Sequence, residues 1–473
     1  MINNKESIGD KSNKRNDYKS ASHKVWPFLG GEEINMNTDN IILHHHPINR
    51  SMPVKTFLAP AEVHNKRNPP DENNESFHRA IGSILAGAQL FGVLPVYGVR
   101  GSSPQQLSFK IISPKTIYSI SLMITLIFMA GVSIMHMIKT LKADTFQVHG
   151  GIAAATAGAV FYGNSLFGLG LFMWLSPRWV NLQKQWRSME LLLDKCKQSR
   201  PRLRWKFRVI TIVIMSLALI EHVLSLIINF PNSNELPVNS TNTWKDYLRI
   251  YTFKSHAFML TSLNYNVALG IFLFTISKIA TFTWNFTDVF IMLVATGIAE
   301  RYKSLNKCLL KSAMIKNLTI DWCEFREYYA ALSILVKRAD SDVSPVILLS
   351  FINNLYFICL QLLNGLSPED MGMVNTVYFF FSFAFLLART VAVTLFTARI
   401  NDQSKLALPA LYNCPASNYT IEMQRLQFQL TTDEVAFTGL KFFYITRNFM
   451  LAVGGAIITY EVVLLQFNVA IKK

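Results

Sequence analysis

The chain has 473 residues, of which 51% are hydrophobic and only 16% charged, and its mean hydropathy is +0.25. Soluble proteins carry charge on about a quarter of their residues, so this composition excludes an ordinary soluble domain and predicts an all-α membrane protein. The net charge of +16 is explained by Lys and Arg on cytoplasmic connectors. It does not indicate nucleic-acid binding, because no basic stripe is interleaved with stacking aromatics.

The first part of the chain differs from the rest in being polar. We expect a disordered cytoplasmic tail at 1–75, and no cleavable secretory signal opens it. The tail contains His44, His45 and His46, but three adjacent imidazoles cannot all face one ion, so we expect no metal site. The next stretch, 77–99, has span length but contains His78, Arg79 and Pro95. We therefore predict an interfacial or re-entrant segment at 76–116, with an eighth span as the alternative.

The remainder, 117–473, contains apolar runs long enough to cross about 30 Å of hydrocarbon. Six are clear, at 117–137, 151–175, 207–229, 343–365, 376–396 and 440–467. A seventh lies within 256–300. No Gly or Pro falls between Gly270 and Gly297 to make a turn, so we predict one long helix there and a seven-helix domain in total.

The charges of the connectors predict the orientation. The connectors 176–206 and 301–342 are rich in Lys and Arg, whereas 366–375 carries only Glu369 and Asp370. Positive-inside placement then puts the N-terminus in the cytoplasm and the C-terminus outside. All five cysteines fall on cytoplasmic connectors or within spans, so we expect no extracellular disulfide. Asn239, in the outer loop 230–255, is the sequon expected to be glycosylated.

The motifs of enzymes are missing from the sequence. It contains no GxSxG, HExxH, Walker or dinucleotide motif, and no paired carboxylates on one intramembrane face. We predict a protein that is not an enzyme and needs no cofactor.

The last run places Thr459, Val463, Gln466 and Phe467 on one helical face. An apolar ring can close a pore by dewetting, and an amide can replace part of an ion's hydration shell. Packing against neighbouring helices explains the same face equally well. Glu461 points away from this face. Its partner is unassigned, because Arg389 is expected at a different depth.

A second polar group is expected in the outer half of the membrane. Polyol recognition needs an aromatic platform and fixed hydrogen-bond partners, and Trp284, Asn285 and Asp288 supply both. The further candidates for this outward-open pocket lie in the third, fifth and sixth spans: Glu221, His222, Gln361, Asn364 and Tyr378. The alternative is that these side chains only hydrogen bond between helices.

Four segments resemble the insect gustatory receptors, and among them the sugar receptor branch. They are TYEVVLLQF (459–467), FHRAIGSILAGAQLFGVLPVYGV (77–99), FTWNFTDVFIML (282–293) and ARTVAVTLFTARINDQSKLAL (388–408). The first is similar to the signature that ends the last span of that family, with Glu461 as a departure from its hydrophobic pattern. The resemblance covers most of 77–473.

The resemblance implies a sugar-gated non-selective cation channel in the plasma membrane of chemosensory neurons. It implies a homotetramer or heterotetramer around the four last spans, opened by a mono- or disaccharide. Val463 and Phe467 would form the gate and Gln466 a polar ring, while 301–342 and 397–438 would form a cytoplasmic anchor. Relatives are expected to have an aromatic residue, often Trp, facing the sugar at the position of Phe380.

Two other classes are weighed against this one. A seven-helix receptor coupling to a cytoplasmic transducer would have its N-terminus outside, and neither DRY nor NPxxY is present. A small-solute secondary carrier would show repeated halves with matched broken helices, and the sequence shows none.

Overall fold

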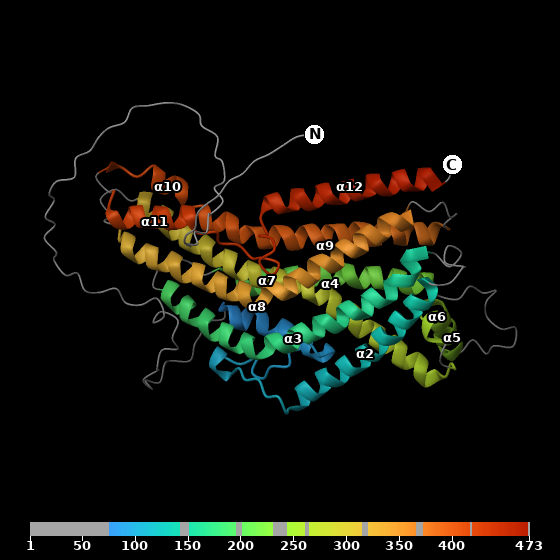
Figure 1. The fold of residues 1–473 in the computed structure, drawn as a ribbon. Coiled ribbons are helices and arrows are strands. Elements are labelled where there is room, and N and C mark those ends of the chain that lie inside the picture. Colours follow the sequence, from blue (N-terminus) through green and yellow to red (C-terminus); the bar gives the residue numbers. More distant parts are fainter. Residues whose placement is uncertain are drawn as a thin grey trace, which may run out of the picture. The chain divides into compact units, whose positions relative to one another are not determined.

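Long helices dominate the described part of the protein (Figure 1). The computed structural model describes residues 75–141, 151–194, 201–229, 244–260, 264–314, 320–365, 372–416 and 419–471, all within the unit 54–473. The tail, with His44 to His46, and the sequon Asn239 lie outside these ranges. The helices are α1 (Phe77–Ala88), α2 (Pro114–Leu141), α3 (Gly151–Leu193), α4 (Leu203–Ile228), α5 (Trp244–Ser255), α6 (Ala257–Leu260), α7 (Val267–Met314), α8 (Trp322–Gly365), α9 (Met373–Lys405), α10 (Leu408–Tyr412), α11 (Ile421–Thr432) and α12 (Arg447–Ile471), with short 3-10 turns at Gln89–Phe91 and Pro104–Gln106.

Six of these helices are long and apolar enough to cross a membrane: α2, α3, α4, α7, α8 and α9. Each contains a run predicted as a span. Most of the stretch 256–300 forms one long helix, α7, as the lack of Gly and Pro between Gly270 and Gly297 predicts, but this helix begins at Val267 and the separate short helix α6 precedes it. The predicted connector 230–255 is not only a loop, because it includes the helix α5.

Three helices continue well past the predicted spans. α3 runs on to Leu193, α7 ends at Met314 and α8 begins at Trp322, so much of the predicted connectors 176–206 and 301–342 is helical. A helix that continues satisfies its own backbone groups, and its apolar stripe goes on packing against neighbouring helices. The protein therefore has a helical cytoplasmic part under the proposed orientation.

The last long helix begins later than predicted. The run 440–467 was expected to be helical from its start, but α12 starts at Arg447. Residues before it form a turn in which Leu440 and Lys441 have positive φ, and Ile445 donates a backbone hydrogen bond to Phe437. This turn is fixed to α8, because the carboxylate of Asp340 accepts bonds from the backbone and hydroxyl of Thr438 at 2.6 and 2.8 Å.

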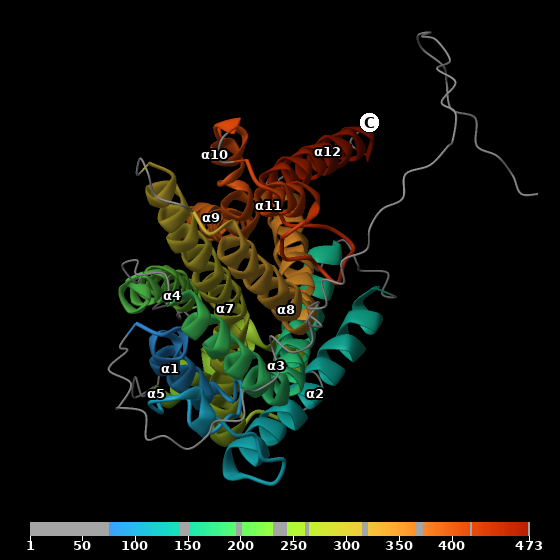
Figure 2. The ribbon, with the colours of Figure 1, turned by 90° about the vertical axis from the view of Figure 1, so that its left-hand side faces the viewer.

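α7 lies at the centre of the helix packing. It contacts α3, α4, α8 and α9, and Figure 2 shows it among these helices with α2 and α12 at the edge. Every residue from Asn285 to Tyr302 is buried. A helix buried all round belongs to the core, so α7 is the element on which the other spans are organised.

α1 packs beneath this core rather than crossing a membrane. Its 12 residues span roughly 18 Å, too short for the hydrocarbon, which argues against an eighth span at 77–99. The ring of Phe77 stacks on Trp186 with 3.7 Å between centroids, and its N–H donates to Glu190 at 3.0 Å. The helical segment ends at Gly92, where φ is 75°.

Candidate functional site

A buried ion pair joins the helices α7 and α9. The guanidinium of Arg389 on α9 lies 2.9 Å from the carboxylate of Asp288 on α7, and the two side chains are 2% and 0% exposed. Charges inside a membrane domain are costly unless they are paired and hydrogen bonded. The pair is therefore expected to be supported on all sides.

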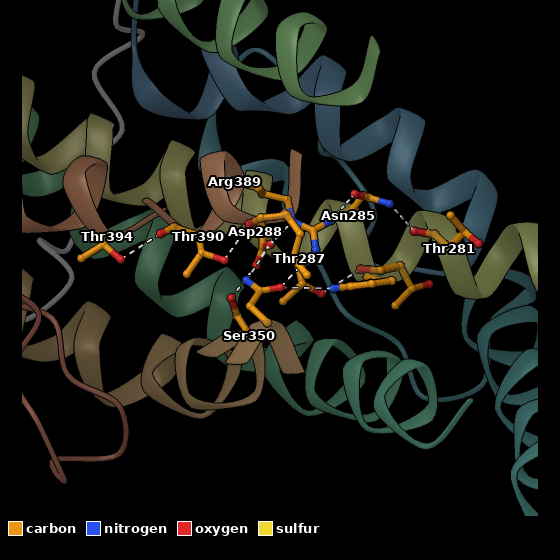
Figure 3. A network of polar contacts seen from close by, with 12 residues as sticks. Thr281, Asn285, Thr287, Asp288, Ser350, Arg389, Thr390 and Thr394 are labelled. Carbon is orange, nitrogen blue, oxygen red and sulfur yellow. Dashed lines mark hydrogen bonds and ion pairs between the residues drawn. The ribbon is translucent and has the colours of Figure 1, made fainter. Parts of the chain in front are cut away.

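The support comes from α7 and α8 (Figure 3). Ser350 and Asn354 donate hydrogen bonds to Asp288, the second at 3.1 Å. Arg389 donates to the amide oxygens of Asn285 and of Asn354, the latter at 3.1 Å. One polar cluster thus ties three helices together at the depth of the ion pair.

An aromatic wall covers this polar cluster. The guanidinium of Arg389 lies 4.7 Å from the ring centroid of Trp284 and 5.4 Å from that of Phe385. The indole N–H of Trp284 donates to Asn354 at 3.3 Å, and its ring stacks on Phe357. Trp284 and Asp288 therefore do lie on one face of α7, as predicted, and both meet Asn354.

A second polar cluster lies between α4, α8 and α9. The carboxylate of Glu221 accepts hydrogen bonds from Ser382 at 3.1 Å and from Tyr378 at 3.4 Å. The amide N–H of Gln361 donates to Ser382 at 3.0 Å. We call Glu221, Gln361, Tyr378 and Ser382 the outer cluster. It combines a carboxylate, a phenol, a hydroxyl and an amide, the groups that recognise polyols.

The outer cluster has unused hydrogen-bonding capacity. The carbonyl oxygen of Gln361 is buried without a partner among the described residues, and so is Nε2 of the adjacent candidate His222. Arg389 interacts electrostatically with Glu221 as well as with Asp288. The outer cluster can therefore accept a further hydrogen bond at Gln361, and its carboxylate lies within electrostatic range of Arg389.

The predicted pocket residues do not all gather in one place. Glu221, Gln361 and Tyr378 meet through Ser382, whereas Trp284, Asn285 and Asp288 gather around Arg389. His222 lies within electrostatic range of Lys278 on α7. Phe380 is 63% exposed and lies edge-on to Phe379. The side chain of Asn364 is outside the described set.

A pocket of about 450 Å³ opens at the predicted outer end of α4. It was not foreseen from the sequence, because α5 supplies half of its wall. Lys278 contacts two of the lining residues, with its ammonium 4.4 Å from the ring centroid of Phe274 and 3.3 Å from the hydroxyl of Tyr251. The lining residues are Leu226, Asn229, Trp244, Tyr247, Leu248, Tyr251, Ile271 and Phe274.

The predicted pore residues lie on a helix with few neighbours. α12 packs on α8 and α9, and the ring centroid of Phe449 lies 5.4 Å from that of Phe351 on α8. Thr459, Val463 and Gln466 are exposed, and the hydroxyl of Thr459 bonds back to Gly455 within the helix. The side chains of Glu461 and Phe467 are outside the described set. Within the described ranges, no group of three His, Cys, Asp or Glu side chains is arranged to hold a metal.

The model of one protein family matches residues 60–473, and its description is trehalose receptor. The match covers most of the sequence. The chain belongs to the trehalose receptor family.

Relatives in Drosophila melanogaster extend this family assignment. The gustatory receptor for sugar taste 64a is 32% identical over 408 residues, covering 85% of this chain and 86% of the relative. The gustatory receptor 5a for trehalose is 31% identical over 399 residues, covering 83% and 85%. The resemblance to sugar gustatory receptors drawn from the four segments is confirmed.

Solved structures share the all-helical fold. The olfactory receptor OR5 from the insect Machilis hrabei aligns with a TM-score of 0.61 and 13% identity, covering 82% of this chain and 97% of the receptor. The same receptor in complex with eugenol gives a TM-score of 0.58. The trehalose receptor family member described here thus shares the fold of a known chemosensory receptor.

Several residues of the site were missed from the sequence alone. Ser382, Ser350 and Asn354 stand in apolar runs, where a lone hydroxyl or amide is usually satisfied by a neighbouring helix and gives no signal of its own. Arg389 did give a signal, because an intramembrane cation needs a partner. Asp288 was the available acid, but it had been interpreted as a ligand contact.

Proposed function

We propose that this chain is a sugar receptor that opens a non-selective cation pore lined by α12, in an assembly of four subunits in the plasma membrane. The observation that carries the proposal is the exposure of α12. Of its described residues none is buried, although they are largely apolar. Lipid can cover the apolar side chains of this helix, and copies of it around an axis would bring its polar side chains together around a shared path.

The stripe on α12 supports a role in conduction. Thr459, Val463 and Gln466 recur on one face, so four copies facing an axis would place an apolar ring next to a polar one. Phe467 would extend the apolar ring. Such a pore closes by dewetting and conducts when the ring widens.

The outer cluster is the proposed sugar contact. Gln361 of this cluster carries a buried polar atom without a partner in the described chain, as does His222, which follows Glu221 in the sequence, and a sugar hydroxyl can satisfy such atoms. Glu221 is a charged acceptor, which binds hydroxyls more strongly than a neutral one. Trp284 and Phe380 remain the aromatic side chains proposed to contact the sugar.

The buried ion pair is the proposed link between binding and opening. A sugar bound to Glu221 would lie within electrostatic range of Arg389. Arg389 on α9 is bonded to residues of α7 and α8. α12 in turn packs on α8 and α9. Sugar opens the pore only if it binds the open arrangement more tightly than the closed one.

Recording from purified protein in planar bilayers tests the function. We expect openings that depend on a mono- or disaccharide and carry Na⁺ and K⁺ alike. A receptor that needs a cytoplasmic transducer would give no current in this preparation, and a carrier would give sugar uptake without unitary openings. Either result would contradict the proposal.

A further inference from the structure

A second pocket lies at the other end of α4 and is lined by basic side chains. Its volume is about 380 Å³, within the range of small-molecule sites. Four arginines line it, and the nearby Glu75, whose carboxylate accepts a hydrogen bond from the backbone N–H of Arg204 at 3.3 Å, is not among its lining residues. The lining residues are Arg79, Gly82, Ser83, Val99, Arg100, Gly101, Ser102, Arg204 and Arg208.

The arginines are brought together by close contact between α1, the segment after it and α4. Gly82 packs so tightly that a Cβ there would lie 2.1 Å from the carbonyl oxygen of Val99, so the backbones touch. Arg79 donates from Nε to the carbonyl of Ser102 at 3.3 Å, which holds it at the rim. Arg204 and Arg208 are one helical turn apart on α4, which contacts α1 (Figure 2).

The surroundings of the pocket are typical of a membrane surface. Trp205, between Arg204 and Arg208, is 68% exposed, and α4 begins its apolar span at this end. Tryptophan is enriched at the level of lipid headgroups, and arginine beside it faces their phosphates. The proposed orientation places this end of α4 in the cytoplasmic leaflet, and the inference rests on that orientation.

Guanidinium groups recognise phosphate by paired hydrogen bonds, and four of them line this one pocket. Basic pockets beside spans on the cytoplasmic side suit phosphorylated headgroups. We propose that this pocket binds the phosphorylated headgroup of an anionic phospholipid of the cytoplasmic leaflet, with Arg79, Arg100, Arg204 and Arg208 holding its phosphate groups.

Such a ligand would fasten α1 to α4. The two helices meet at the core, where the ring of Phe77 on α1 packs on Trp186 of α3 and lies 5.6 Å from the ring of Phe207 on α4. The bound lipid should therefore raise the thermal stability of the whole unit, because it binds the folded state only.

The test uses the full chain in phosphatidylcholine nanodiscs with or without phosphatidylinositol bisphosphate. Bound lipid is counted by native mass spectrometry and stability by thermal unfolding. Arg100→Gln and Arg208→Gln should each weaken binding by at least about tenfold, since a hydrogen bond to a charged group contributes about 1.5–3 kcal/mol. Arg202→Gln is the matched control, an exposed arginine at the start of α4 outside the pocket, and should lose at most about fivefold.

Equal losses in all three variants would show diffuse attraction to an anionic surface and would overturn the site. Unchanged binding in Arg100→Gln and Arg208→Gln would overturn it as well. Unfolding of each variant without the lipid is compared first, so that a folding defect is separated from lost binding. A parallel experiment with soluble inositol trisphosphate identifies the source of the phosphate. Thermal stabilisation of the protein by this compound that depends on Arg100 and Arg208 supports the site. If the soluble compound binds but the lipid does not, the assignment to a membrane lipid is overturned.

The outcome is separable from that of the proposed function. Sugar-evoked currents with no arginine-dependent lipid binding would overturn this inference alone. Specific lipid binding by a chain that passes no current would overturn the proposed channel alone.

Discussion

The middle of α7 and the length of α12 are both apolar helices, but they are packed in opposite ways. Every residue from Asn285 to Tyr302 on α7 is buried, and even Asp288 is fully enclosed by partners of the same chain. No described residue of α12 is buried, and Leu451 and Ile458 are 71% and 66% exposed. The middle of α7 is enclosed by its own chain, whereas α12 is covered by few described residues of that chain.

The comparison separates two kinds of polar residue in a membrane domain. On α7, Asn285 and Asp288 are bonded to side chains of neighbouring helices. Those on α12, such as Thr459 and Gln466, have no partner helix in the described chain and are available for an ion path. The predictions below test whether the first region is structural and the second is functional.

The largest expected effect is the loss of the core ion pair. Arg389→Met leaves Asp288 as an uncompensated buried charge and should destabilise the protein by about 3–5 kcal/mol. Thermal unfolding of the purified protein measures this. Arg425→Met is the control, because Arg425 pairs with Glu422 at the surface and should lose at most about 1 kcal/mol. Equal stability of the two variants would show that the core pair does not hold the subunit together.

Much of this core was predictable from the sequence, but its pairing was not. Apolar length located α2, α3, α4, α7, α8 and α9, since each run had to match the bilayer. The predicted start of α12 is too early, because the residues of the turn fixed by Asp340 and Thr438 are largely apolar, like those of the helix, and hydropathy cannot separate the two. The pairing of Arg389 with Asp288 depends on how two distant helices lie side by side, which local pattern does not contain.

The next effect concerns the outer cluster. Glu221→Gln removes a charged acceptor and should shift the sugar dose–response by about 10- to 100-fold, because such a bond is worth about 1.5–3 kcal/mol. Currents from cells expressing the variant measure the shift. Glu324→Gln is the matched control, a carboxylate that also accepts from a tyrosine, Tyr328, but on the proposed cytoplasmic side. A normal dose–response in Glu221→Gln would remove this residue from the sugar site.

Acidification tests the burial of two histidines outside the spans, His78 and His256, through its effect on the stability of the protein. Burial, with a contribution from nearby cations, lowers the pKa of His78 and of His256 from 6.5 to about 4. The unfolded chain therefore binds protons first as the pH falls, and stability present above pH 6.5 is lost between there and pH 4. From pH 7 to pH 5 we expect a loss of about 2 kcal/mol per histidine.

Thermal unfolding of the wild type and of His256→Asn at both pH values checks this. The variant should show about half of the pH-dependent loss. A wild type whose stability is the same at both values would contradict the burial of these two rings.

The smallest effect on stability is expected on α12. Val463→Ala removes two methyl groups from a side chain that is 41% exposed, so the subunit should lose less than about 1 kcal/mol. Basal current without sugar should nevertheless rise, because a smaller apolar ring closes a pore less well. Leu451→Ala, on another face of α12, is the control for current. Unchanged leak in Val463→Ala would argue against a gate at this position.

The central claim, that α12 lines the ion path, is tested most directly by cysteine substitution during recording. A charged, membrane-impermeant thiol reagent is applied from outside to Val463→Cys and to Leu451→Cys while sugar holds the channel open, with the wild type reporting on the native cysteines. We predict that the reagent blocks the current through Val463→Cys and leaves that through Leu451→Cys and the wild type unchanged. Full labelling of Val463→Cys with no change in current would contradict the claim.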